Sequence, residues 1–306
     1  MPATPAAQPT LVNNVAVDEQ DQPRFAQPEV TAAPTEFHIK HASDAAAYKT
    51  LDAMAGAHEL KPKPFPAARG GGEPILTMAQ IPGDNGPAAE KQVTTAGKLV
   101  FHSVGDTGNT HGPALQDEVA DKLAHDFTDP PGDLPRFFFH LGDVIYSFGE
   151  ARYYYDQFYD AYRNYPAPIA ALAGNHDGMV APNTGARSLD AFLRNFCAEH
   201  FEITPEAGGL DRAAQIQPGV YFTFEAPFVR ILPLYSNAIE DPGVISAHGG
   251  QFPEVTDVQL TYLRTALTRV KSDAFQGAVI IAHHHPAYTI AGERGHGSST
   301  DMRKEI

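Results

Sequence analysis

Short apolar runs that end at polar residues recur along the last two thirds of the chain. In residues 137–146, three phenylalanines and a leucine come before Gly142-Asp143. Continuous apolar runs of this kind are typical of strands that are covered on both faces of a sheet. Four such runs, at residues 99–106, 137–146, 171–177 and 279–285, end at Asp, Asn or His. The pattern predicts strands that carry polar side chains at their carboxyl ends, where open α/β sheets usually place ligands.

Helical periodicity separates the first two of these runs. In residues 114–127 the large apolar side chains form one stripe, at Leu115, Val119, Leu123 and Phe127. Such a stripe indicates an amphipathic helix. With the strand-like runs before and after it, the segment predicts a βαβ unit. The run at residues 171–177 extends this unit to βαβαβ, which favours parallel pairing of the strands.

A second type of strand pairing is expected later in the chain. Two apolar runs, at residues 220–225 and 228–234, are separated only by Ala226-Pro227 and predict an antiparallel hairpin. A helix that begins near Thr256 leads from this hairpin to the last strand. The sequence therefore predicts an α/β fold with both parallel and antiparallel strands.

The first 96 residues lack this pattern. Residues 1–36 are rich in Pro, Ala, Thr and Gln and have few large apolar side chains, so burial cannot offset the entropy of ordering them. One short helix is expected from Ser43 to about His58, and the prolines and glycines of residues 61–72 follow it. We therefore expect an N-terminal tail and linker over residues 1–96 and one domain over residues 97–306.

Composition excludes several classes of protein. The chain has 306 residues with 22 Lys and Arg against 37 Asp and Glu, a formal charge of −15, so nucleic-acid binding is not expected. One cysteine permits neither an internal disulfide nor a cysteine-based zinc site. No apolar run approaches the roughly 18 residues of a membrane span. The chain as written has no signal peptide and is expected to be cytoplasmic, unless a leader precedes it.

The strand ends carry the ligand types that two neighbouring metal ions require. These are oxygen and imidazole ligands, a carboxylate that bridges the ions, and an open position for water. Residues of these types are Asp106, Asp143, Tyr146, Asn175 and the three histidines His283, His284 and His285. A tyrosine, with its ordinary pKa of about 10, binds as phenolate only beside a strong Lewis acid such as ferric iron. Each residue also has a structural interpretation, because Asp after Gly is common in turns and a tyrosine often packs in a core.

Four motifs in order carry a resemblance to a known family. They are Gly105-Asp106-Thr107-Gly108, Gly142-Asp143-Val144-Ile145-Tyr146, Gly174-Asn175-His176-Asp177 and Ile281-Ala282-His283-His284-His285-Pro286. Over roughly residues 97–306 they resemble the calcineurin-like metallophosphoesterases, and the tyrosine of the second motif resembles the purple acid phosphatase branch. The resemblance implies a layered α/β/β/α sandwich of mixed β-sheets flanked by helices.

The resemblance also implies metal ligands. Asp106 and Tyr146 would bind a first metal ion, which is ferric iron in the purple phosphatases. Asp143 would bridge both ions. Asn175 and His284 would bind the second ion, which is iron, zinc or manganese. His284 is the expected ligand among the three histidines because the family places this ligand two residues before the proline.

Further histidines are candidates for contact with substrate. The resemblance implies that His176 binds the phosphate and helps the leaving group to depart. His283 and His285 flank the expected ligand, and His111 lies in the loop after Asp106. His296 lies in a segment similar to the loop that carries an active-site histidine in small acid phosphatases. It is therefore a candidate proton donor or phosphate contact.

One family motif has no counterpart in the chain. The last motif, Gly-His-x-His, does not occur, and we expect a domain truncated at its C-terminus rather than a lost motif. The expected activity is metal-dependent hydrolysis of phosphoesters, with an acid-phosphatase-like preference for monoesters of a small molecule or a protein. The alternatives are a phosphodiesterase on the same site and a non-catalytic binding protein of the same fold. The sequence does not indicate an oligomeric state.

Overall fold

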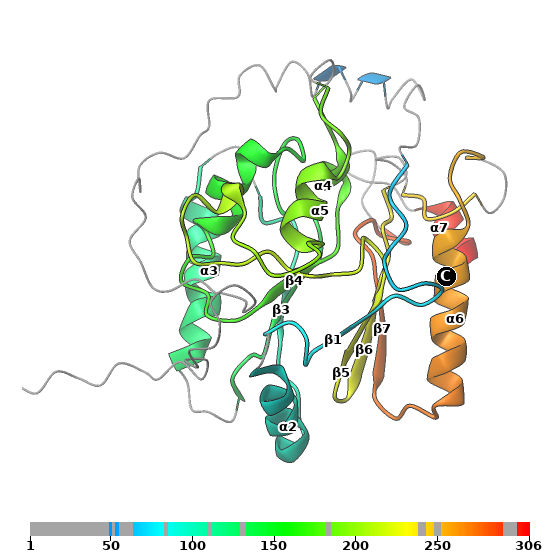
Figure 1. The fold of residues 1–306 in the computed structure, drawn as a ribbon. Coiled ribbons are helices and arrows are strands. Elements are labelled where there is room, and N and C mark those ends of the chain that lie inside the picture. Colours follow the sequence, from blue (N-terminus) through cyan, green and yellow to red (C-terminus); the bar gives the residue numbers. More distant parts are fainter. Residues whose placement is uncertain are drawn as a thin grey trace, which may run out of the picture.

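The computed structural model describes most of the chain after residue 63 (Figure 1). The described residues are 49–50, 53–54, 64–82, 85–108, 112–128, 133–181, 185–237, 243–247, 252–289 and 299–306. Its elements in chain order are β1 (Ile75–Thr77), α2 (Gly86–Ala96), β2 (His102–Val104), α3 (Ala114–His125), η2 (Asp126–Thr128), β3 (Phe138–His140), η4 (Ala151–Tyr153), η5 (Tyr155–Tyr159), β4 (Ile169–Ala171), α4 (Asn175–Gly178), α5 (Asp190–Phe196), η6 (Pro205–Ala207), β5 (Thr223–Ala226), β6 (Val229–Pro233), α6 (Val258–Ser272), β7 (Ala278–Ala282) and α7 (Thr300–Glu305).

The first sheet is the parallel unit that the apolar runs predicted. It has three strands in the order β2-β3-β4, and both pairs are parallel. Val104 of β2 aligns with His140 of β3, and His140 aligns with Ala171 of β4. Because the three strands run in the same direction, their carboxyl ends lie at one edge of the sheet.

The second sheet is mixed and has the order β1-β5-β6-β7. The predicted hairpin is confirmed, since β5 and β6 are antiparallel, while β7 pairs parallel to β6. The remaining strand, β1, pairs parallel to β5 although it belongs to the segment that we expected to be a tail and linker. A short apolar run, Ile75-Leu76, is enough to extend an existing sheet. The boundary expected at residue 96 therefore does not coincide with the edge of the sheet.

The two sheets pack face to face, and helices cover their outer faces (Figure 1). Alternation along β3 shows how the layers form. Phe137 and Phe139 join Leu76, Phe224 and Ile231 in a cluster between the sheets, whereas Phe138 joins the cluster on the helical side. Successive side chains of a strand point to opposite faces, so a run of three phenylalanines fills two separate layers of the core. The predicted layered α/β/β/α sandwich is confirmed.

Helix α6 covers the outer face of the four-stranded sheet (Figure 1). It carries Leu260, Leu263 and Ala266 into the core. Its exposed positions include charged side chains such as Arg264. Among the described residues, no helix is both long enough and apolar enough to span a bilayer.

Helix α3 differs from the prediction in the face that it buries. Leu115 is 79% exposed and Val119 is 42% exposed, whereas Gln116 and Ala120 are buried. The helix is rotated because the side-chain amide of Gln116 donates a hydrogen bond to the carbonyl of Gln157 at 2.6 Å. Only the C-terminal half of the predicted stripe packs against the core. Residues 49–50 and 53–54 are helical, as predicted, and the rest of the helix expected from Ser43 to His58 lies outside the described residues.

Candidate metal centre

Three of the predicted ligands meet at the carboxyl ends of strands from both sheets. Asp106 follows β2, Asp143 follows β3 and His284 follows β7. One potential ligand atom from each residue lies within 4.8 Å of those of the other two. Asp143 is buried and Asp106 is exposed, so the cluster reaches from the interior to the surface. Residues 178 positions apart in sequence are thus held together by rigid strands.

Both aspartates lie in turns that glycine makes possible. Asp106 and Asp143 have left-handed φ angles of 55° and 52°, and Gly142 has a φ of 92°. Asp tolerates this region better than most residues do. A Cβ on Gly142 would lie 2.8 Å from Nδ1 of His284, and a Cβ on Gly174 would lie 2.2 Å from Oδ1 of Asp143. Both glycines are therefore needed for the close approach of backbone to ligand.

The ring of His284 is oriented as a metal ligand requires. Its Nδ1 lies 3.0 Å from the carbonyl oxygen of Leu141, which can only accept, so Nδ1 carries the proton. Its Nε2 is left to face Asp143, 3.4 Å from Oδ2. A backbone carbonyl that fixes one ring nitrogen in this way is a usual outer partner of metal-ligating histidines. Burial opposes protonation of His284, but the hydrogen bond to Asp143 and its charge raise the pKa to about 9.

Tyr146 joins the cluster through its hydroxyl. The oxygen lies 2.6 Å from Oδ2 of Asp143 and 3.2 Å from Oδ1 of Asp106. One proton cannot serve both acceptors at once, so the phenol alternates between the two carboxylates or donates to the nearer one. Burial and then the charge of Asp143 raise the pKa of Tyr146 above its ordinary value. The phenol oxygen thus lies beside both carboxylates, and its role as a metal ligand stays a prediction.

Helix α4 brings His176 to the buried carboxylate. The amide N–H of His176 donates to Oδ1 of Asp143 at 2.9 Å. Nδ1 of the ring lies 2.8 Å from the carbonyl of Ser147 and therefore carries a proton, while Nε2 lies 4.0 Å from Oδ2 of Asp143. Asn175, the first residue of α4, is fully buried. Its assignment as a ligand, like that of the other predicted site residues, stays a prediction.

Asp177 has a role that the sequence analysis did not foresee. Its carboxylate is fully buried and accepts hydrogen bonds from the amides of Val144 at 3.1 Å and Gly174 at 2.8 Å. Burial and the charge of Asp143 raise the pKa of Asp177 to about 7. Its side chain ties the turn after β3 to the turn before α4. No local signal marks it, because an Asp that follows Asn-His in a loop is unremarkable by itself.

The remaining candidate histidines differ in their placement. His283 is partly buried, and its Nδ1 lies 2.6 Å from the carbonyl of His285. His285 is 1% exposed, and its Nδ1 lies 3.0 Å from Oγ of Ser236, so this ring packs in the interior. Its contact with substrate stays a prediction. His111 and His296 lie outside the described residues.

The charge balance of the cluster suits a divalent cation. Burial opposes ionisation of Asp143, but a hydrogen bond with His284 and the charges of His176 and His284 hold its pKa below the usual range. Within the described part of the chain, neither Asp106 nor Asp143 forms an ion pair with Lys or Arg. Two carboxylates and one imidazole are ligands that zinc, iron and manganese accept. The residues present therefore fit a metal centre.

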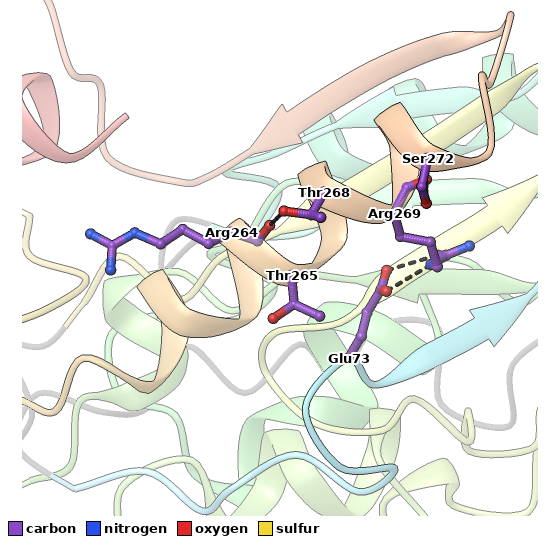
Figure 2. Close-up of a pocket in the computed structure, with 6 residues that line it drawn as sticks. All are labelled: Glu73, Arg264, Thr265, Thr268, Arg269 and Ser272. Atoms are coloured by element: carbon purple, nitrogen blue, oxygen red, sulfur yellow. Dashed lines mark hydrogen bonds and ion pairs between the residues drawn. The ribbon is translucent and has the colours of Figure 1, made fainter.

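A separate surface pocket lies against α6 (Figure 2). Its lining side chains are Glu73, Arg264, Thr265, Thr268, Arg269 and Ser272. They come from α6 and from the segment before β1, and they include none of the candidate ligands. The chemistry of the cluster is therefore independent of this pocket.

Comparison with known proteins identifies a matching family model and no matching curated protein. The family model described as calcineurin-like phosphoesterase matches residues 101–305, which include every motif that carries the candidate ligands. A search of curated proteins found no match.

Proposed function

The chain belongs to the calcineurin-like phosphoesterase family, and we propose that it hydrolyses phosphoesters at a dinuclear metal centre built on Asp106, Asp143 and His284. The observation that carries the proposal is the meeting of these three side chains, with ligand atoms within 4.8 Å of one another. The three residues belong to different motifs in the sequence, and the fold brings them together where strands of both sheets end. Membership of the family makes metal-dependent phosphoester hydrolysis the expected chemistry.

We assign the ligands to two ions. Asp106 and Tyr146 would hold the first ion, Asp143 would be shared by both, and Asn175 and His284 would hold the second ion. The position of the Tyr146 hydroxyl, 2.6 Å from Asp143 and 3.2 Å from Asp106, supports its place at the first ion. A phenolate ligand favours ferric iron there, and iron, zinc or manganese fits the second position.

The residues of the chain have distinct roles in hydrolysis. When bound, the two ions supply Lewis acidity to the phosphate oxygens and lower the pKa of a water molecule towards about 7. His176 faces the cluster with Nε2, because its Nδ1–H is occupied by the carbonyl of Ser147. In its protonated form Nε2 donates to a phosphate oxygen or to the departing oxygen, which contributes about 10²–10⁴-fold in such reactions. Asp143 keeps His176 in place through the backbone amide.

The tyrosine motif supports a preference for phosphomonoesters, as in the purple acid phosphatase branch. We propose a small molecule or a protein as the carrier of the phosphate. His283 directly follows β7, is partly buried, and stays a candidate for contact with substrate, as do His111, His285 and His296. Leaving-group preference depends on the loops around the cluster, so a diester is the competing substrate.

The experiment compares two substrates and one variant. Wild-type protein loaded with metal should hydrolyse p-nitrophenyl phosphate faster than bis-p-nitrophenyl phosphate, and a chelator should abolish turnover. Asp143→Ala removes the bridging carboxylate, so we expect a loss at least as large as the about 10²–10³-fold that follows removal of one transition-state contact. Circular dichroism checks that the variant is folded. Turnover that persists in folded Asp143→Ala would refute the proposal, and faster hydrolysis of the diester would reassign the substrate.

A further inference from the structure

Two histidines lie at opposite ends of neighbouring strands of the parallel sheet. His102 lies in β2 and His140 in β3, and each comes shortly before a Gly-Asp turn. His102 stands three residues before Gly105 and His140 two residues before Gly142, and by sequence both resemble ordinary histidines of a sheet. Their side chains, however, have different partners.

His102 contacts residues away from the carboxylates. Its Nδ1 lies 3.1 Å from the hydroxyl of Tyr165, and its Nε2 lies 3.0 Å from Oδ2 of Asp126. Both partners belong to the helical side of the three-stranded sheet, where the ring also packs near Phe127. This histidine stabilises the fold and has no contact with the candidate ligands.

His140 contacts both Gly-Asp turns. Its ring is fully buried at the end of β3. Nε2 lies 2.7 Å from Oγ1 of Thr107, the residue directly after Asp106. Nδ1 accepts a hydrogen bond from the amide of Gly142, the residue directly before Asp143, at 3.2 Å. One ring therefore joins the neighbours of both carboxylates.

The protonation of the ring follows from these partners. A backbone amide only donates, so Nδ1 of His140 has no proton, and a neutral imidazole then holds its proton on Nε2. The Nε2–H donates to the hydroxyl of Thr107. Burial lowers the pKa of His140 to about 3, against the opposing charge of Asp143, so the ring is neutral at neutral pH. One donor and one acceptor are fixed at opposite sides of a rigid ring.

The two turns need such a restraint. Asp106 and Asp143 both have left-handed backbone, which persists only where the surroundings hold it. The turns also share the hydrogen bond from the amide of Asp106 to the carbonyl of Gly142, at 2.9 Å. The ring of His140 adds a side-chain connection that reaches across the same pair of turns.

We propose that His140 is a positioning residue of the metal centre, whose neutral ring sets the separation of Asp106 and Asp143 by binding Thr107 and Gly142. The inference rests on the proposed function, because it gives the two carboxylates the role of metal ligands. Partners of this outer kind orient metal ligands, and their loss typically weakens metal binding by about 10–100-fold.

The test measures metal affinity rather than turnover. Mn²⁺ is titrated calorimetrically into metal-free wild-type protein, His140→Phe and the matched control His102→Phe. Phenylalanine keeps the ring volume and removes both hydrogen bonds in each case. We expect Mn²⁺ binding to weaken by about 10–100-fold in His140→Phe and to stay within about twofold of wild type in His102→Phe, although each variant loses two hydrogen bonds.

A second pair of variants isolates the contact with Thr107. This side chain is only partly buried, so Thr107→Val is expected to fold even where His140→Phe does not. Thr107→Val should weaken Mn²⁺ binding, Thr107→Ser should restore it, and the double variant with His140→Phe should be no weaker than His140→Phe alone. Wild-type affinity in both His140→Phe and Thr107→Val would overturn the inference and leave the proposed function standing. A wild-type protein that binds no Mn²⁺, Zn²⁺ or iron would overturn both.

Discussion

Carboxylates gather at two places in this protein, and their partners differ. Beside α6 lies a group that we name the arginine network, whose members are Glu73, Glu225, Arg230, Arg269 and Asp273. Arg269 binds Glu73 with two hydrogen bonds, at 2.6 and 2.7 Å (Figure 2). At the metal centre, Asp106 and Asp143 contact a phenol and two imidazoles, and no arginine or lysine pairs with them among the described residues.

The difference in partners indicates that the carboxylates of the arginine network stabilise the fold, whereas those of the candidate metal centre are suited to binding a cation. A carboxylate removed from water needs a partner that replaces its hydration. In the arginine network the guanidinium groups, which are always charged, supply it permanently. Burial would raise the pKa of Glu73, but its bonds to Arg269 and Thr223 hold the pKa below the ordinary value. At the candidate metal centre the partners are a phenol and two imidazoles, whose place beside the carboxylates a metal cation could take.

Of the substitutions that test this comparison, Gly174→Ala should change metal affinity the most. Its Cβ would lie 2.2 Å from Oδ1 and 2.4 Å from the backbone nitrogen of Asp143, so the carboxylate of Asp143 must move. We expect metal affinity to fall by about 100-fold or more, because loss of an outer partner alone costs about 10–100-fold. The free energy of unfolding should fall by about 1–3 kcal/mol. Calorimetric titration of Mn²⁺ and urea denaturation measure the two effects.

The control is Gly72→Ala, the same chemical change at a glycine with open space around its Cβ position. This variant should bind Mn²⁺ and unfold like the wild type. Unchanged metal affinity in Gly174→Ala would mean that the close approach to Asp143 has no part in binding.

Arg269→Met should have a smaller effect, and it should lower stability without changing metal affinity. Loss of the guanidinium leaves Glu73 and Glu225 without their main partner, and breaking a fully buried pair costs about 3–5 kcal/mol. Because a quarter of the Arg269 side chain is exposed, we expect about 1–2 kcal/mol in urea denaturation. Affinity for Mn²⁺ should not change, since no member of the network is a candidate ligand.

Arg264→Met is the matched control for this prediction. Arg264 lies on the same helix, but its side chain extends away from Glu73 (Figure 2). It should alter stability by less than about 0.5 kcal/mol, as exposed substitutions usually do. A weakened metal site in Arg269→Met would show that the two groups of carboxylates are coupled and that the comparison is wrong.

Most strands, and the type of pairing in two places, followed from the sequence because apolar runs indicate buried strands. The parallel unit and the hairpin are examples. Strand β1 was missed because its apolar run is brief and lies among prolines and glycines. The face of α3 was missed because a buried hydrogen bond from Gln116, made to a residue far along the chain, outweighs the apolar stripe.

The candidate site was predictable only in part. Parallel strands of one sheet end at the same edge, so Asp106 and Asp143 could be brought together from the strand pattern. His284 follows a strand of the other sheet, and only the family resemblance placed it with them. The residues that contact the neighbours of the ligands could not be predicted, because their roles depend on the direction of each side chain. His102 and His140 both precede a Gly-Asp turn in sequence, but His102 begins β2 whereas His140 ends β3, and their side chains have different partners. Asp177 likewise acts on backbone amides that no sequence pattern marks.

The central claim is that Asp106 and Asp143 hold metal ions while the arginine network does not. Its most direct test is the metal content of purified wild type, Asp143→Asn and Glu73→Gln by mass spectrometry, with a visible spectrum of each sample. Each substitution removes one negative charge and keeps the shape of the side chain. We expect about two ions per chain in wild type and Glu73→Gln, with a tyrosinate-to-iron absorption band, and loss of both ions and band in Asp143→Asn. Equal metal content in Asp143→Asn, or no metal in the wild type, would contradict the account.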